Sequence, residues 1–179
     1  MLLTFLQTLS LLLPIFISGL FLILCIKKRL FVGLDIPLDK GTRMWGQPLF
    51  GANKTYRGIL VHVGISITVT VILWYFAPSA PWIHPIFYNS PLILGFLYAA
   101  AYSLGELINS FIKRRLAIPA GTQAKRIQYF FDTTDGIILV GCMFVGVYHV
   151  APLQALAAVV LGCGAHLATD ALMKRLRLK

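Results

Sequence analysis

The chain has 179 residues, of which 58% are hydrophobic and only 12% are charged, and its formal net charge is +10. A soluble domain of this length has too little interior to bury so large an apolar fraction, so the composition excludes an ordinary soluble protein. In a membrane, the basic groups are expected to meet membrane lipids or phosphorylated small molecules, and no nucleic acid is expected as a partner.

The apolar residues come in long blocks, each close to the roughly 20 residues that a helix needs to cross a bilayer. The connections between the blocks leave no room for a separate soluble domain. We therefore predict an all-α membrane protein in which residues 1–179 form a single transmembrane domain of five helices. The predicted spans are residues 2–26, 59–76, 92–112, 127–150 and 153–173.

The connections between these spans differ in composition. The first, residues 27–57, is long, basic and rich in glycine and turn residues. The second holds four prolines and Trp82, as expected of a loop at the membrane interface. The third, residues 113–126, is again basic, and the fourth is a short turn at Pro152.

The positions of the cations predict the topology. All 16 lysines and arginines fall in the first connection with its flanks, in the third connection, or in the C-terminal tail. They are Lys27, Lys28, Arg29, Lys40, Arg43, Lys54 and Arg57, then Lys113, Arg114, Arg115, Lys125 and Arg126, and finally Lys174, Arg175, Arg177 and Lys179. Because cytoplasmic segments are enriched in Lys and Arg, we expect the N-terminus outside and the C-terminus and both basic connections in the cytoplasm. The expected location is the cell membrane, with a multi-pass chain and a cytoplasmic-facing site.

Two carboxylates, Asp132 and Asp135, lie in the first two turns of the fourth predicted span. Residues three apart share a helix face, so the two groups repel each other unless a cation lies between them. A divalent metal supplies that cation, and oxygen-only ligands favour Mg²⁺. The alternative is ion pairing with Lys125, Arg126 or a neighbouring span. The occurrence of a pair, beside the small residue Gly136, favours the metal.

A basic triplet, residues 113–115, ends the third span. Cations at the end of a membrane helix can simply anchor its topology. However, Asn109 and Ser110 lie one turn earlier and stack with Lys113 and Arg114 at a spacing of four residues. This arrangement makes a donor-rich helix face that is suited to phosphate.

Glu106 lies on the same helix stripe as Asn109 and Lys113. A carboxylate inside a membrane span is a candidate functional group. A structural pairing of Glu106 with Lys113 or Arg57 is the alternative, and the sequence does not decide between the two.

A run of possible phosphate donors precedes the second span. Asn53, Lys54 and Arg57 lie between Gly51 and Gly58. As a bare pattern this run is weak, because it does not fit the P-loop sequence and no strand precedes it.

Two stretches together resemble the CDP-archaeol synthase family of membrane cytidylyltransferases. GELINSFIKRRLAIPAG followed by FDTTDGIILVG is similar to the family's Lys-Ser-Phe-x-Lys-Arg-Arg run, Pro-x-Gly loop and Asp-Gln-x-Asp element. Residues 50–58 match a second family element, Phe/Leu-Gly-x-x-Lys-Thr-Trp-Arg-Gly, with Tyr56 in place of tryptophan. The chain departs from the family pattern at Asn109, Thr133 and Gly136, where lysine, glutamine and an aromatic residue are usual.

This resemblance implies transfer of CMP from CTP to a lipid phosphate, giving CDP-lipid and pyrophosphate, with Mg²⁺ as cofactor. The lipid is an archaeol-type 2,3-bis-O-geranylgeranylglyceryl phosphate or a related phosphatidate-like lipid. The implied catalytic residues are Lys113, Arg114, Asp132 and Asp135, of which Asp132 and Asp135 also hold the metal. The implied substrate-binding residues are Asn53, Lys54, Arg57, Ser110 and Arg115.

Two other classes of function stay open from the residues alone. One is a small phosphate- or cation-coupled membrane transporter, in which the same charges would line a pathway. The other is a non-catalytic membrane scaffold, whose cations would only anchor anionic lipid. The one-sided placement of the charges counts against the transporter, because nothing comparable lies on the outer face.

Overall fold

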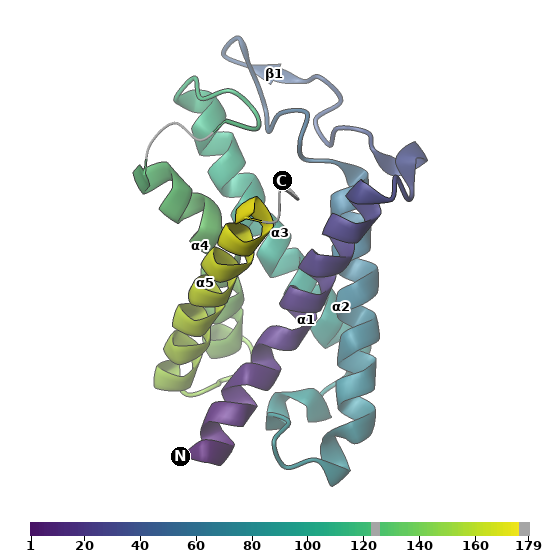
Figure 1. Cartoon of the computed structure of the whole chain (residues 1–179), viewed down its shortest axis with the longest axis vertical. Coiled ribbons are helices and arrows are strands. Elements are labelled where there is room, and N and C mark those ends of the chain that lie inside the picture. The colour runs from purple at the N-terminus through teal and green to yellow at the C-terminus, as the bar shows by residue number, and fades with distance from the viewer. Residues whose placement is uncertain (123–125, 176–179) are drawn as a thin grey trace.

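Five long helices make up most of the chain in the computed structural model, and they pack side by side in a bundle (Figure 1). They are α1 (Leu2–Lys27), α2 (Tyr56–Phe76), α3 (Pro91–Arg115), α4 (Arg126–Gly146) and α5 (Pro152–Arg175). Each contains a segment long and apolar enough to cross a membrane. The prediction of an all-α membrane protein with five spanning helices is therefore confirmed.

The structure describes residues 1–122 and 126–175, and the side chains of residues 1–122 and 128–169. Lys125, Arg177 and Lys179 lie outside the described residues, as do the side chains of Arg126, Lys174 and Arg175. The pairing of the aspartates with Lys125 or Arg126, considered above, therefore lies outside them too.

The two basic connections lie at the same end of the bundle. In Figure 1 the connection between α1 and α2 and the connection between α3 and α4 are both at the top, and the N-terminus is at the bottom. The proline-rich connection carries the short 3₁₀ helices η2 (Ala77–Ser79) and η3 (Pro85–Tyr88), and it lies at the lower end. The two basic connections therefore lie at one end of the bundle, and the proline-rich connection, which has no lysine or arginine, lies at the other. Which end faces the cytoplasm stays a prediction.

The first connection contains structure that the sequence did not predict. A 3₁₀ helix, η1 (Val32–Leu34), is followed by a hairpin of two very short antiparallel strands, β1 (Arg43–Met44) and β2 (Gln47–Pro48). Trp45 and Gly46 form its two-residue turn, and both have positive φ angles, 53° and 78°. Two positive φ angles are the signature of the tight hairpin turn that fits the twist of the strands.

Helix α2 begins at Tyr56, three residues before the predicted start of the second span. Thr55 caps it, since its hydroxyl oxygen accepts a hydrogen bond from the backbone N–H of Gly58 at 3.3 Å. This cap satisfies one of the free N–H groups of the first helical turn. It also fixes the neighbouring residue Lys54 close to the helix bundle.

The apolar core occupies the half of the bundle away from the basic connections. Tyr98 is fully buried at its centre, between the rings of Phe87 and Phe144, and its hydroxyl donates to the backbone oxygen of Leu11 at 3.0 Å. These residues come from η3, the start of α3, the end of α4 and the start of α1. The opposite ends of the same helices are left to carry polar groups.

Glycines allow α3 to approach its neighbours closely. A Cβ atom placed on Gly105 of α3 would lie 2.7 Å from the Cα of Gly136 on α4. A Cβ atom on Gly95 would lie 2.8 Å from the backbone nitrogen of Ile67 on α2. Small residues at such points let membrane helices pack backbone to backbone.

We predict that Gly105→Ala destabilises the protein, because the added methyl group would meet the backbone of α4 and not the end of a flexible side chain. Overpacking of this kind costs about 1–3 kcal/mol or more. Thermal unfolding of the purified protein in detergent measures the effect. Gly64→Ala on α2 is the matched control, since nothing lies within 4 Å of a Cβ atom there. Equal melting temperatures for the two variants would contradict the prediction.

Candidate functional site

A polar cavity of about 210 Å³ lies where the basic ends of α3 and α4 meet the first connection. Its lining residues are Asn53, Lys54, Glu106, Asn109, Ser110, Lys113, Gly121, Thr122, Asp132 and Asp135. Six of the nine predicted site residues are among them, namely Asn53, Lys54, Ser110, Lys113, Asp132 and Asp135. Residues from three separate parts of the sequence therefore meet in one cavity.

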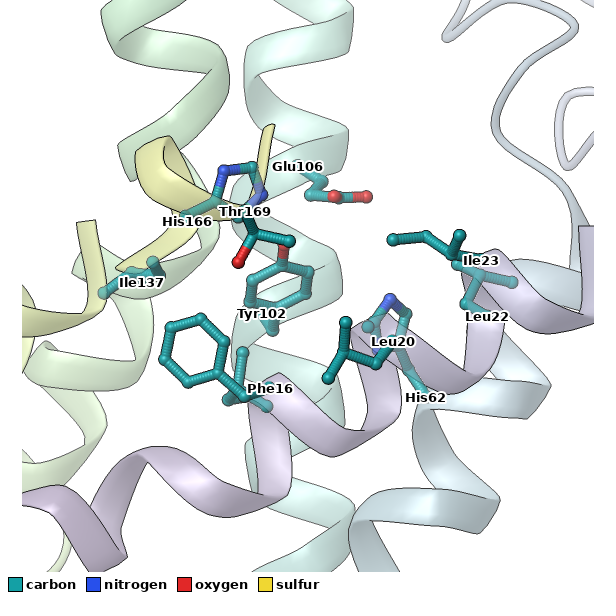
Figure 2. A pocket seen from close by; sticks show the side chains of 12 residues that line it. Phe16, Leu20, Leu22, Ile23, His62, Tyr102, Glu106, Ile137, His166 and Thr169 are labelled. Atoms are coloured by element: carbon teal, nitrogen blue, oxygen red, sulfur yellow. The ribbon is translucent and has the colours of Figure 1, made fainter. Parts of the chain in front are cut away.

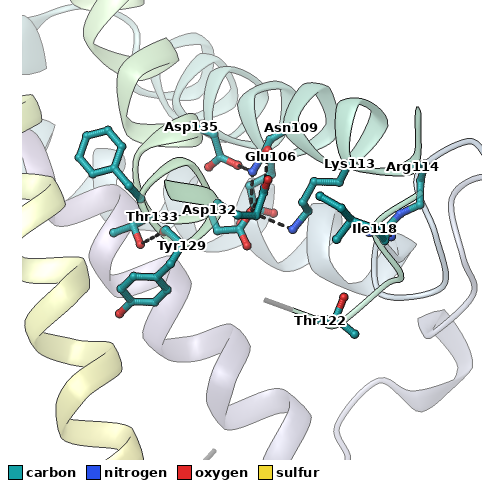
Figure 3. Close-up of polar contacts among 12 residues, drawn as sticks. Glu106, Asn109, Lys113, Arg114, Ile118, Thr122, Tyr129, Asp132, Thr133 and Asp135 are labelled. Atoms are coloured by element: carbon teal, nitrogen blue, oxygen red, sulfur yellow. Dashed lines mark hydrogen bonds and ion pairs between the residues drawn. The ribbon is translucent and has the colours of Figure 1, made fainter. Parts of the chain in front are cut away.

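Asp132 and Asp135 on α4 face Asn109 and Lys113 on α3 (Figure 3). The Asn109 amide Nδ2 donates to Asp132 Oδ1 and to Asp135 Oδ2, both at 2.8 Å. Lys113 Nζ donates to Asp132 Oδ1, also at 2.8 Å. Gln128, one turn before Asp132, donates to the same Oδ1 atom at 3.1 Å. The two carboxylates thus converge on one point, which the amide nitrogen of Asn109 occupies.

Lys54 reaches the cavity from the first connection. Its backbone oxygen accepts a hydrogen bond from Leu38 N–H at 2.8 Å, and Pro37 pairs with Thr55 in a short β-bridge. Its ammonium group forms an ion pair with Glu106 Oε2 at 2.6 Å. The alternative partners considered for Glu106, Lys113 and Arg57, are therefore not the ones that it binds.

Two of the predicted arginines contact other parts of the chain. Arg57 forms an ion pair with Asp35 at 3.0 Å. Arg114 is buried, with 2% of its surface exposed, and its guanidinium donates to the backbone oxygens of Phe50 and Ile118. It therefore ties together the two connections that border the cavity, and it does not line the cavity itself.

Arg115 holds the hairpin of the first connection. Its guanidinium donates to the backbone oxygens of Met44, Gln47 and Pro48 and stacks 5.6 Å from the ring of Trp45. Arg57, Arg114 and Arg115 are not among the residues that line the polar cavity, although Arg114 lies near enough to Asp132 to interact with it electrostatically. Their assignment to substrate stays a prediction, and the contacts described here are structural.

Asp39 supports the segment that precedes Asn53. Its carboxylate accepts hydrogen bonds from the backbone N–H groups of Gly51 at 2.9 Å, Phe50 at 3.0 Å and Gly41 at 3.1 Å. Burial by itself raises the pKa of the Asp39 carboxyl group, but these hydrogen bonds together lower that pKa below its ordinary value. The ionised Asp39 therefore stabilises the loop at pH values above the ordinary pKa of an aspartate. This stabilisation is lost as the pH falls through the lowered pKa of Asp39.

Among the described lining residues, negative charge is in slight excess. Two ammonium groups, from Lys54 and Lys113, are outnumbered by three carboxylates, from Glu106, Asp132 and Asp135. A bound polyphosphate would add negative charge next to these carboxylates and would need cations to compensate it. No cluster of three or more His, Cys, Asp or Glu side chains suited to a metal occurs among the described residues. The aspartate pair nevertheless suits Mg²⁺, which proteins commonly hold through one or two carboxylates together with substrate phosphates.

A second cavity, of about 220 Å³, adjoins the first inside the bundle (Figure 2). It is lined mainly by apolar side chains of α1, with His62, Tyr102, Ile137 and His166 from the other helices. Glu106 lines both cavities. A polar compartment and an apolar compartment therefore meet at this one carboxylate.

Asn109 and Glu106 also line the cavity. Helix periodicity had placed both on the face of Lys113 and marked them as candidates, but neither was among the nine predicted site residues. Gly121 and Thr122 come from the connection after α3, and no sequence pattern predicted their position.

The whole chain, residues 1–179, matches the model of the CarS-like CDP-archaeol synthase family. A CDP-archaeol synthase of Pyrobaculum aerophilum is 31% identical over 144 residues, which cover 80% of this chain and 79% of that protein. The CDP-archaeol synthase of Thermococcus onnurineus is 36% identical over 98 residues, and that of Thermococcus gammatolerans is 38% identical over 93 residues. These matches cover 52% and 49% of this chain, and the chain spans about half the length of the two Thermococcus relatives, 53% and 50%.

A solved structure of an intramembrane enzyme for archaeal membrane lipid biosynthesis has a similar fold. Its TM-score is 0.66 at 22% sequence identity, and the alignment covers 90% of this chain and 91% of that one. The resemblance that the two sequence elements indicated is confirmed by the family match.

We predict that Asp39→Asn loosens the loop that carries Asn53 and Lys54. An amide offers one acceptor oxygen in place of two, so at least one backbone N–H loses its partner, at a cost of about 1–3 kcal/mol. Hydrogen exchange of at least one of the Gly41, Phe50 and Gly51 amides should accelerate in the variant. Asp35→Asn is the matched control, because Asp35 pairs with a side chain and should leave these amides protected. Unchanged exchange of all three amides in Asp39→Asn would show that the Asp39 carboxylate does not hold this loop in place.

Proposed function

The chain belongs to the CDP-archaeol synthase family, and from this premise we propose that it is an integral membrane cytidylyltransferase. It transfers the cytidylyl group of CTP to a lipid phosphate, an archaeol-type or a related phosphatidate-like lipid, and releases pyrophosphate. The observation that carries this proposal is the polar cavity itself. It gathers two lysines and two converging aspartates at the end of membrane helices, directly beside an apolar cavity.

The residues of the polar cavity suit this reaction without a dedicated base. An oxygen of the lipid phosphate attacks the α-phosphorus of CTP, and the bond from that phosphorus to the oxygen bridging to the β-phosphate breaks. The bonding electrons leave with pyrophosphate. A phosphate monoester is already ionised near neutral pH, so no side chain must remove a proton first. The chain supplies charge neutralisation and alignment.

Lys54 and Lys113 are the cations among the described lining residues, and they would bind phosphate oxygens. Each is paired with a carboxylate in the cavity, Lys54 with Glu106 and Lys113 with Asp132. A phosphate oxygen that approaches either lysine can share or replace that carboxylate. Ser110 and Asn53 line the same space and add neutral hydrogen-bond donors.

Asp132 and Asp135 would hold Mg²⁺. When bound, Mg²⁺ would neutralise charge on the triphosphate and favour departure of pyrophosphate. The aspartates also hold Lys113 and Asn109 in place on the facing helix. The excess of carboxylates among the described lining residues supports the proposal, because a triphosphate bound there needs compensating cations.

The apolar cavity is placed to receive the start of the lipid chains. Its lining comes mainly from α1 (Figure 2), and it shares Glu106 with the polar cavity. A phosphate in the polar cavity and hydrocarbon in the apolar one would therefore belong to one lipid molecule that stays in the bilayer.

The active site is proposed to face the cytoplasm of a cell membrane. Both basic connections lie at the end of the bundle that holds the polar cavity, and cytoplasmic loops are enriched in Lys and Arg. That side also contains the nucleotide pool. No observation favours the transporter or the scaffold, and the family match does not support either.

We predict that the purified protein, with labelled CTP, Mg²⁺ and an archaeol-type or acyl lipid phosphate, forms a labelled lipid that partitions into organic solvent. Asp132→Asn and Asp135→Asn should each lower the rate by about a hundredfold or more, since each removes a charged metal ligand. Both variants should keep the melting temperature and the gel-filtration profile of the unmodified protein within experimental error.

Asp35→Asn serves as the control for loss of a carboxylate outside the cavity, and it should retain activity. Near-full turnover in both Asp132→Asn and Asp135→Asn would refute the metal assignment. If the unmodified protein formed no labelled lipid from either lipid class with any nucleoside triphosphate, the proposed function would be wrong.

We further predict that Gly19→Phe weakens use of the lipid. Gly19 lines the apolar cavity, and nothing lies within 4 Å of a Cβ atom built there, so a larger side chain would begin in open space and should occupy part of the cavity. The KM for lipid phosphate should rise about tenfold, a change of about 1.4 kcal/mol, while the KM for CTP stays the same.

Gly64→Phe is its matched control, because Gly64 is also a helical glycine in open space but does not line the cavity. Steady-state rates with each substrate varied in turn give both KM values. An equal rise in the KM for CTP, or no rise for the lipid, would show that the apolar cavity does not receive the lipid.

A further inference from the structure

Asn109 occupies the point on which the two aspartates converge. Its Nδ2 atom lies 2.8 Å from an oxygen of each, so the amide takes the place that a cation would take between them (Figure 3). Its other end, Oδ1, accepts a hydrogen bond from Gln128 Nε2 at 3.3 Å. The side chain is therefore held with its amino end toward the carboxylates and its carbonyl end toward Gln128.

An asparagine side chain offers opposite chemistry at its two ends. The amino end donates hydrogen bonds and suits carboxylates, whereas the carbonyl oxygen accepts them and suits a hard metal ion. We propose that Asn109 is a third protein ligand of the divalent cation. Its amide holds the two aspartates together without the cation and turns to present Oδ1 when the cation binds. This inference rests on the proposed function, because it takes the aspartate pair as the metal site.

The surrounding contacts allow this exchange. Gln128 donates both to Asn109 Oδ1 and to Asp132 Oδ1, so it keeps the second of these hydrogen bonds if the Asn109 amide turns. Lys113 also stays bonded to Asp132 Oδ1. Asp132 thus remains in position while the amino group of Asn109 moves away from the two carboxylates.

The neutrality of the asparagine side chain matters in a cavity whose described lining residues already carry a slight excess of negative charge. A carboxylate at position 109, in addition to Asp132 and Asp135, would bind the cation more tightly but would also repel the triphosphate. The lysine that is usual in the family at this position has no acceptor atom for a metal, so ligation through residue 109 would be particular to this chain. A neutral amide adds an oxygen ligand without changing the charge of the site, so the metal and the nucleotide can be bound together.

The test measures the Mn²⁺ concentration that half-saturates the purified protein in the presence of CTP, by electron paramagnetic resonance of the free ion. Mn²⁺ is the probe because it takes the same oxygen ligands as Mg²⁺ and is visible to this method. Asn109→Ala should weaken Mn²⁺ binding about tenfold or more, and Asn109→Asp, which restores an oxygen ligand, should bind at least as tightly as the unmodified protein. Asn89→Ala, which removes an amide beside η3 at the opposite end of the bundle, should leave the Mn²⁺ affinity unchanged.

A second readout separates ligation from a structural role. Protein labelled with ¹³C at the asparagine side-chain carbonyl should show hyperfine coupling between ¹³C and Mn²⁺, and that coupling should vanish in Asn109→Ala but persist in Asn89→Ala. Unchanged or tighter Mn²⁺ binding in Asn109→Ala would overturn the inference, since the amide would then act only as a hydrogen-bond donor. Equal weakening in Asn109→Ala and Asn109→Asp would overturn it as well, because the loss would come from misplaced aspartates.

Absence of saturable Mn²⁺ binding to the unmodified protein would also refute the inference. In that case formation of labelled lipid from CTP, measured separately with and without a metal chelator, would still decide the proposed function.

Discussion

The close contact of α3 with α4 at Gly105 and Gly136 determines where the charged groups of the polar cavity lie. Helices in a bilayer gain little from burying apolar side chains against each other, because lipid is equally apolar, so close backbone packing and polar contacts hold them together. One turn beyond Gly105, Asn109 meets both aspartates of α4 at 2.8 Å. A wider spacing would break these bonds and leave polar groups unpartnered near the hydrocarbon, which is costly.

The three cations at the end of α3 have different roles because successive helix residues point about 100° apart. Only Lys113 shares the face of Asn109, while Arg114 and Arg115 point toward the connections. A guanidinium has five donors in a rigid plane, so it can bind several backbone oxygens at once and hold a loop. The Lys113 ammonium is a point charge on a flexible stem, and it can pass from Asp132 to a substrate phosphate without moving the backbone. The arginines therefore hold the connections in place, whereas Lys113 lines the cavity itself.

The sequence was sufficient for the five helices, because bilayer thickness sets their length and apolar blocks of that length are unambiguous. Helix periodicity also placed Asn109 and Lys113 on one face. The hairpin could not be predicted, since Trp45 adopts a positive φ that its side chain disfavours and that contacts with Arg115 stabilise. The pairing of Arg57 with Asp35 could not be predicted either, because it depends on how the first connection folds back against α2. Local patterns predicted the elements, whereas pairings between distant loops required the tertiary structure.

Glu106 lies where the two cavities meet, and this position bears on the proposed reaction. A carboxylate between a polar and an apolar compartment would repel a lipid phosphate that arrived there, unless a cation accompanied it. Under the proposed function Lys54 would be that cation, since it lies 2.6 Å from Glu106 and comes from a connection and not from a helix. Passing its ammonium from the carboxylate to a phosphate exchanges one anionic partner for another, which costs less than leaving the ammonium unpaired. Such an exchange needs a loop that stays in place without the ion pair. The hydrogen bonds of Asp39 to Phe50 and Gly51, together with the contact of Arg114 to Phe50, provide that support.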